Sequence, residues 1–139
     1  MTVTLPPEYR PSEQEPFMNE TMREYFRQKL LQWRSELLRD SDETLHQMQD
    51  EGGLQEPDIA DRASAEADRA LELRTRDRER KLISKIDAAL GRIAEDSYGY
   101  CEETGEPISI RRLEARPIAT LSIEAQERHE KMERTHREE

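Results

Sequence analysis

The stretch EYFRQKLLQWRSELL, residues 24–38, decides how the first half of this chain folds. Its apolar residues recur at steps of four, three and four, which is the spacing of one face of a helix: Phe26, Leu30, Trp33 and Leu37. The stripe then continues one residue later, as expected when a straight helix drifts relative to a heptad repeat: Leu38, Ser41, Leu45 and Met48. Residues 17–51 contain no Gly or Pro, so the pattern predicts one long helix.

A second long helix is predicted to begin near residues 58–61, after Gly52 and Gly53 have ended the first, and to run to about residue 96. A short turn joins the two helices, so we expect them to pair antiparallel as a coiled coil over residues 17–96. Small residues lie near the tip, at 52–63, and larger ones near the base: Ala63, Ala67 and Ala70, then Ile83, Ile86, Leu90 and Ile93. About thirty helical residues would project roughly 45 Å, which calls for a functional explanation.

Three further segments flank the coiled coil. Residues 1–16 contain four prolines, which predicts a flexible arm. Residues 97–121 are rich in turn residues with short strand signals and are expected to form a small globule, in which residues 111–116 make a helical turn. Residues 122–139 predict a final helix, so the fold class is mainly α.

Composition narrows the classes of function. The 139 residues are 33% hydrophobic and 39% charged, with a net charge of −10. Binding to a nucleic-acid backbone needs clustered cations, so we expect a protein partner and no direct contact with DNA. Neither a signal peptide nor a membrane-spanning run is evident, so we expect a cytoplasmic protein that does not bind membranes, and a monomer.

Catalytic motifs are absent from the sequence, which contains no GxSxG, P-loop, GxGxxG or HExxH pattern. The three histidines His46, His129 and His136 lack ligand spacing, so we do not expect an enzyme. The single cysteine, Cys101, can form neither an internal disulfide nor a four-ligand zinc site, and we expect a buried or half-buried thiol.

The acidic pair Asp58 and Asp61, in PDIADRA at the predicted tip, has two interpretations. Asp58 can cap the second helix, and Asp61 can interact favourably with the dipole of its first turn. Capping does not explain why the pair would lie at the end of a long projecting coiled coil.

Four stretches together resemble the DksA family over about residues 18–128: MNETMREYFRQKLLQWRSELL, HQMQDEGG, PDIADRASAEADRALELRTRDRERKLISKI and YGYCEETGEPISIRRLEARPIATLSI. The resemblance implies a protruding antiparallel coiled coil, a zinc-finger-like globule and a C-terminal helix. It also implies a transcription factor that enters the secondary channel of RNA polymerase and acts with guanosine tetraphosphate. Such factors inhibit ribosomal RNA promoters and favour some biosynthetic promoters.

The resemblance assigns roles to residues of the coiled coil. The tip motif DxxDxA falls on Asp58, Asp61 and Ala63, which would reach toward the catalytic centre of the polymerase. Arg78 matches a position that contacts the rim of the channel, within a run of five cations and two acids over residues 74–81. A solvated helix face laced with ion pairs is the structural alternative for Arg78.

Guanosine tetraphosphate would bind, by the same resemblance, at positions that carry Leu82, Lys85, Arg116 and Gln126 here. Gln126 stands where a lysine is expected, so one charge-assisted phosphate contact is missing. Lys85 and Arg116 could retain partial binding, or could be ordinary surface cations.

The globule departs from the zinc pattern of the family, which is two CxxC motifs. The four ligand positions carry Cys101, Thr104, Ser122 and Ala125, so no tetrahedral zinc site is expected. We expect a small apolar core in its place: Tyr98, Tyr100, Ile108, Ile110, Leu113, Leu121 and Ile123.

Two other classes of function stay open. A transcript-cleavage factor of the GreA type also presents carboxylates through the secondary channel, but would use them to hold a catalytic metal. A coiled-coil adaptor without an active tip would depend on its seam and not on Asp61.

Overall fold

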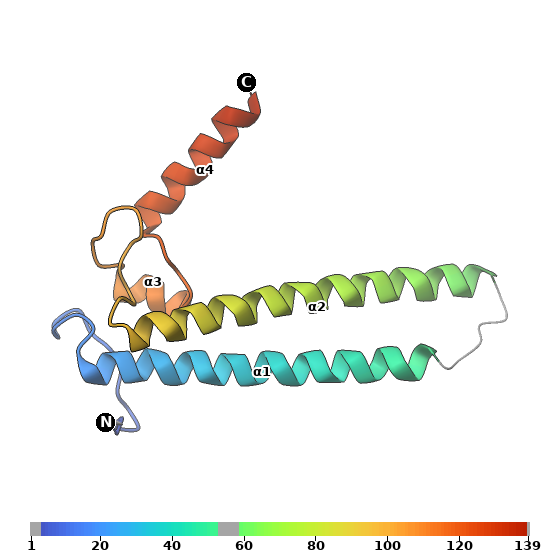
Figure 1. The fold of residues 1–139 in the computed structure, drawn as a ribbon, viewed down its shortest axis with the longest axis horizontal. Helices are drawn as coiled ribbons and strands as arrows, with labels where there is room; N and C mark the ends of the chain where they lie inside the picture. The colour runs from blue at the N-terminus through green and yellow to red at the C-terminus, as the bar shows by residue number, and fades with distance from the viewer. Residues whose placement is uncertain (1–3, 53–58, 139) are drawn as a thin grey trace. The chain divides into compact units, whose positions relative to one another are not determined.

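The computed structural model describes the backbone of residues 4–52 and 59–138 (Figure 1). Within these ranges, the side chains of residues 44, 45, 47–52, 59–61, 137 and 138 lie outside the description. The described ranges contain four helices and no strand: α1 (Glu20–Gly52), α2 (Ile59–Ala94), α3 (Ile110–Ala115) and α4 (Ile123–Glu138). None of the helices described is long and apolar enough to cross a membrane. The mainly helical fold expected from the sequence is confirmed.

The chain divides into two compact units. The coil unit comprises residues 31–87, and the base unit comprises residues 1–30 together with 88–139. α1 and α2 each contribute residues to both units.

The coil unit consists of the adjoining parts of α1 and α2, which run antiparallel and side by side (Figure 1). Arg34 Nε on α1 donates a hydrogen bond to Asp87 Oδ1 on α2 at 2.7 Å, and this contact raises the pKa of Arg34. Leu37 and Ile86 are buried, whereas Trp33 and Ile83 are half-buried. Leu38, expected in the seam, is exposed, because only one of two adjacent residues on a helix can face the partner helix.

The base unit has an apolar core to which four helices and the loops contribute. α1 supplies Met22, Phe26 and Leu30, and the ring of Phe26 lies 5.6 Å from that of Tyr98. The other buried hydrophobic residues of this unit are Met18, Ala89, Ile93, Cys101, Ile108, Ile110, Leu113, Ile118, Ala119 and Ala125. The core therefore joins residues far apart in the sequence.

The loop after α2 is shaped by backbone that turns sharply. Asp96 has φ 62° and Gly99 has φ 93°. A Cβ atom at Gly99 would lie 3.0 Å from Met18 Cε, so the close approach of Met18 favours glycine there. The strand signals of this region produce only an isolated bridge between Tyr100 and Pro107, since the loop reverses before a ladder can extend.

The N-terminal arm, expected to be flexible, makes specific contacts over its described residues. The ring of Tyr9 packs edge-on against Tyr25, at 5.9 Å between centroids, and its hydroxyl donates to the Glu15 carboxylate at 3.1 Å. Burial and this bond raise the pKa of Tyr9 to about 12. Directly after the arm, Phe17 packs against Tyr100, and Met18 is buried. The prolines prevented regular hydrogen bonding but not packing.

Candidate functional site

The predicted tip lies largely outside the described residues. This is the case for Asp58 and for the side chain of Asp61, whose backbone belongs to the first turn of α2. Ala63 is exposed on the following turn. The roles of these residues remain predictions.

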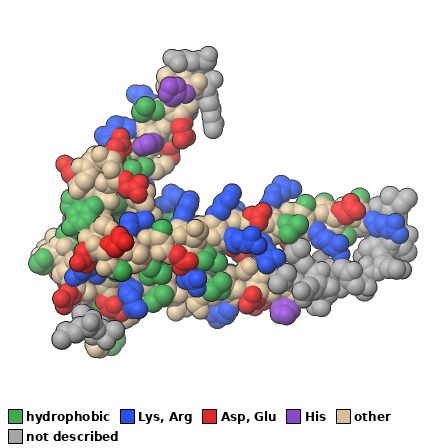
Figure 2. Space-filling view, in the orientation of Figure 1, with side chains coloured by type: hydrophobic (Ala, Val, Ile, Leu, Met, Phe, Trp, Pro, Cys, Tyr) green, Lys and Arg blue, Asp and Glu red, His purple; other side chains and the backbone are tan. Residues whose placement is uncertain are grey.

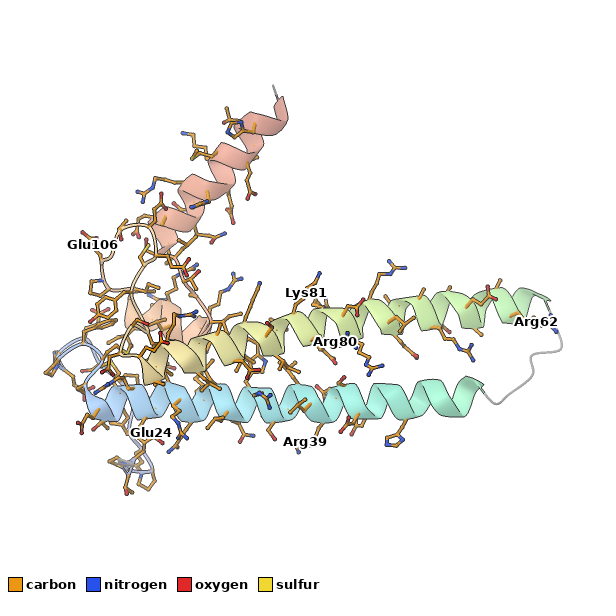
Figure 3. All side chains as sticks on the ribbon, viewed as in Figure 1. Glu24, Arg39, Arg62, Arg80, Lys81 and Glu106 are labelled. Carbon is orange, nitrogen blue, oxygen red and sulfur yellow. The ribbon has the colours of Figure 1, made fainter. Side chains whose placement is uncertain are left out.

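The basic run of residues 74–81 lies on α2, within the coil unit. Arg74, Arg78, Arg80 and Lys81 are exposed, and Lys81 projects from the side of α2 that faces away from α1 (Figure 3). Figure 2 shows further Lys and Arg side chains along this edge of α2. Among the described residues Arg78 has no ion-pair partner, so its guanidinium is available to an acidic surface of another molecule.

The four positions expected to bind guanosine tetraphosphate fall in both units. In the coil unit Leu82 is half-buried and Lys85 is exposed. In the base unit Arg116 is exposed at the end of α3, and half-buried Gln126 donates from Nε2 to Glu130 Oε1 at 3.3 Å. Each residue is thus accessible in its own unit.

The apolar core predicted for the globule is confirmed in part. Tyr98, Ile108, Ile110 and Leu113 are buried, but Tyr100 and Ile123 are 39% and 47% exposed, and Leu121 is half-buried. Tyr100 forms the isolated bridge at the loop surface, and Ile123 begins α4. Their places are taken by Phe26 of the predicted helical stripe and by residues that the sequence did not single out: Met18, Met22, Ile118 and Ala119.

The residues at the four zinc positions do not fit a zinc ion. Zinc prefers thiolate, imidazole and carboxylate ligands, and here Cys101 alone offers one of these. The Thr104 hydroxyl accepts from the Glu106 N–H at 3.2 Å, and the Ser122 hydroxyl accepts from the Ala125 N–H at 3.2 Å. The fourth position is the buried methyl group of Ala125. In the described ranges, no cluster of three or more His, Cys, Asp or Glu could hold a metal.

Cys101 instead sits among hydrogen-bond donors. Its residue surface is 2% exposed. The backbone N–H of Ser122 and the hydroxyl of Thr104 donate to the sulfur, and these bonds outweigh burial and lower the pKa of Cys101 to about 6. Because hydrogen-bond donors stabilise a thiolate, the surroundings of Cys101 favour the anionic form of its sulfur.

Hydrogen bonds that the sequence did not predict hold α3 within the base unit. Lys29 Nζ donates to the Glu114 carbonyl at 2.8 Å and to its carboxylate at 3.1 Å. Burial and a hydrogen bond with Glu114 raise the pKa of Tyr25 to about 12. The Tyr98 hydroxyl donates to the Pro117 carbonyl at 2.7 Å, just after α3. Because Lys29 and Glu114 are 85 residues apart, no local sequence pattern predicts their contact.

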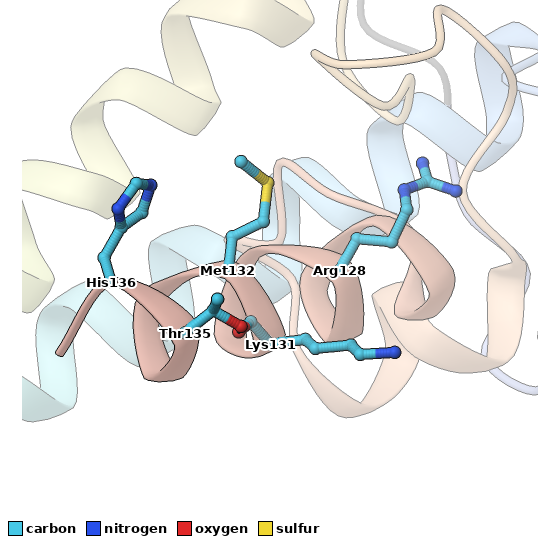
Figure 4. A pocket seen from close by; sticks show the side chains of 5 residues that line it. All are labelled: Arg128, Lys131, Met132, Thr135 and His136. Atoms are coloured by element: carbon cyan, nitrogen blue, oxygen red, sulfur yellow. The ribbon is translucent and has the colours of Figure 1, made fainter. Parts of the chain in front are cut away.

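An open groove runs along α4, with Met132 between Arg128 and His136 (Figure 4). Lys131 and Thr135 complete its lining. None of the residues predicted to form a site lines this groove.

The fold and the altered globule define a class: two-helix coiled-coil proteins that carry a zinc-finger-like domain. Residues 22–93 match the family profile of the DnaK suppressor protein DksA, N-terminal domain, and residues 96–131 match the prokaryotic dksA/traR C4-type zinc finger. The chain belongs to the DksA family.

Its relatives are similar over most of their length. The RNA polymerase-binding transcription factor DksA of Caulobacter vibrioides is 66% identical over 131 residues, covering 94% of this chain and 92% of the relative. The protein of the same name from Escherichia coli K12 is 47% identical over 116 residues, covering 84% and 76%. The structure of transcription factor DksA2 from Pseudomonas aeruginosa has a TM-score of 0.80 and 46% identity, covering 87% of this chain and 94% of that one. These relatives are named as transcription factors and not as enzymes.

Proposed function

We propose that this protein is a transcription factor that binds RNA polymerase through its secondary channel and regulates initiation without catalysing a reaction. The two relatives named as RNA polymerase-binding factors support a polymerase partner. The observation that supports the mode of binding is the exposed Arg78, which lies about five helical turns from Asp61 on the same long helix. A protein that acts on RNA polymerase works in the cytoplasm.

In this proposal the coil has two separate tasks. Arg78 and its exposed neighbours contact the channel rim through charge-assisted bonds, which position the protein. Asp58, Asp61 and Ala63 reach the catalytic centre of the polymerase and change its conformation or local charge. The protein acts as a monomer and does not contact DNA, because its net charge of −10 disfavours a phosphate backbone.

Guanosine tetraphosphate is the proposed co-regulator. Lys85 and Arg116 are exposed cations that could contact its phosphates, with Leu82 and Gln126 completing the set. Since Gln126 is uncharged, we expect weaker binding than in a protein with a cation at this position.

Zinc independence is the third part of the proposal. Apolar burial and the Tyr98 bond to Pro117 replace the coordination that the family's C4-type finger implies. The donors around the Cys101 sulfur fill the role of a metal in stabilising its thiolate.

In vitro transcription with and without guanosine tetraphosphate tests the function. The protein should inhibit a ribosomal RNA promoter, and the nucleotide should enhance the inhibition. Cleavage of RNA in backtracked complexes would instead indicate a factor of the GreA type. Absence of any effect on initiation would contradict the proposal.

A further inference from the structure

α2 turns its polar side chains inward over the distal segment, which we define as residues 62–81. Both leucines of this segment point to solvent, with Leu71 60% and Leu73 47% exposed. The half-buried positions are small or polar: Ala65, Arg69, Glu72, Thr75, Arg76 and Glu79. The seam of a coiled coil is normally apolar, so α2 reverses the usual pattern here.

The inward-facing groups are also poorly satisfied. Among the residues whose side chains are described, Glu72 Oε2, Arg76 Nε and Glu79 Oε2 are inaccessible to solvent and have no hydrogen-bond partner. The three residues are spaced by four and three, which places them on one face of the helix. A buried polar atom without a partner loses its hydration and gains nothing in return, so each weakens the pairing of this segment.

Farther along α2, burial becomes apolar. Ile83 is half-buried and Ile86 is buried within the coil unit, where Arg34 also binds Asp87. Ala89 and Ile93 are buried within the base unit. One continuous helix therefore has a weakly held part and a firmly held part, and such differences produce local opening.

We propose that the distal segment opens and closes independently of the rest of α2, and that the protein partner orders it on binding. The second half of this inference rests on the proposed function, because it takes RNA polymerase as the partner. Ordering the segment consumes part of the free energy of binding. The inward-facing polar residues therefore lower the affinity for the polymerase even though they do not contact it.

Hydrogen exchange of the full-length chain tests the opening. Amides of residues 62–81 should exchange at least about tenfold faster than those of residues 83–93. Equal protection along α2 would overturn the inference.

Two matched variants test the cause. Glu79→Leu replaces an inward acid, and should slow exchange of the distal segment by about tenfold. Asp68→Leu replaces an exposed acid of the same segment that lies outside the basic run of residues 74–81, with the same change of charge and at least as large a gain in helix propensity. It should leave exchange within about twofold of wild type. Equal slowing by both variants would refute a role for the seam.

Binding to RNA polymerase tests the consequence. Glu79→Leu should bind severalfold more tightly than Asp68→Leu, because its distal segment is already ordered. Equal affinities despite slower exchange would refute the ordering by the partner. Failure of the wild-type chain to bind would refute the proposed function and this second half together, and the exchange of the free chain would still decide the first half.

Discussion

Replacing Tyr98 by phenylalanine removes one oxygen atom from the core of the base unit. The Tyr98 side chain is almost fully buried, and its hydroxyl is 2.7 Å from the buried Pro117 carbonyl. Without the hydroxyl, that carbonyl loses a donor that water cannot easily replace, which costs about 1–3 kcal/mol. For a domain of 60–100 residues, each kcal/mol lowers the Tm by about 4–8 °C. We expect a loss of this size for Tyr98→Phe.

The distribution of aromatic residues provides the assay. All four tyrosines, Tyr9, Tyr25, Tyr98 and Tyr100, lie in the base unit, and the single tryptophan, Trp33, lies in the coil unit. Near-ultraviolet circular dichroism of tyrosine and fluorescence of tryptophan therefore follow the two units separately. The tyrosine signal should melt earlier in Tyr98→Phe.

Tyr100→Phe is the matched control, because Tyr100 is partly exposed and its hydroxyl has no hydrogen-bond partner among the described residues. Its unfolding free energy should stay within about 0.5 kcal/mol of wild type. If Tyr98→Phe melts with the control, the hydroxyl does not secure the base unit and the proposed replacement for zinc is wrong.

Three further predictions concern the proposed function. Arg78→Ala should weaken binding to RNA polymerase, whereas Asp61→Asn should bind nearly normally yet fail to inhibit a ribosomal RNA promoter; parallel losses would contradict an active tip. Gln126→Lys should tighten binding of guanosine tetraphosphate to the polymerase complex by about 1.5–3 kcal/mol, and an unchanged affinity would show that this position does not reach the phosphates. Chelators should change neither the Tm nor transcription, and the Cys101 thiolate absorbance should titrate near pH 6, at a higher pH in Thr104→Val. Because the folded pKa lies below the unfolded one, the thiolate should stabilise the protein fully above the unfolded value and lose this effect as pH falls through about 6. Zinc that is retained after chelation, or a thiol that titrates near its ordinary value, would contradict the last prediction.

The sequence predicts the helices well because their signals are local. Spacing around Phe26 and Leu30, together with Gly52 and Gly53, predicts the first helix, and Pro117 follows α3 closely. The base core was predicted less well, because Met18 and Met22 lie before the apolar stripe that begins at Phe26 and were not assigned to it. Ala125 is too small to be recognised as a core residue by its type. The exposure of Tyr100 depends on how a loop reverses, which the sequence does not specify.

The direction of side chains on α2 was also beyond the sequence. Leu71 and Leu73 look like core residues by type, and Glu72 looks like a surface residue, yet their burial is reversed. Helical spacing identifies a face but does not say which face the partner helix covers. The roles of Asp58 and Asp61 depend on another molecule, so no property of this chain alone determines them.

The composition of the base unit has a consequence for synthesis on the ribosome. Its core needs residues 1–30 and residues 88–139, which are separated by the whole of the coil unit. The first thirty residues must therefore wait until the second half of the chain has emerged. A helical hairpin that forms early from residues 31–87 would bring the two ends together and lower the loop-closure entropy of the final assembly. Early formation of the coil unit would then promote folding of the base unit.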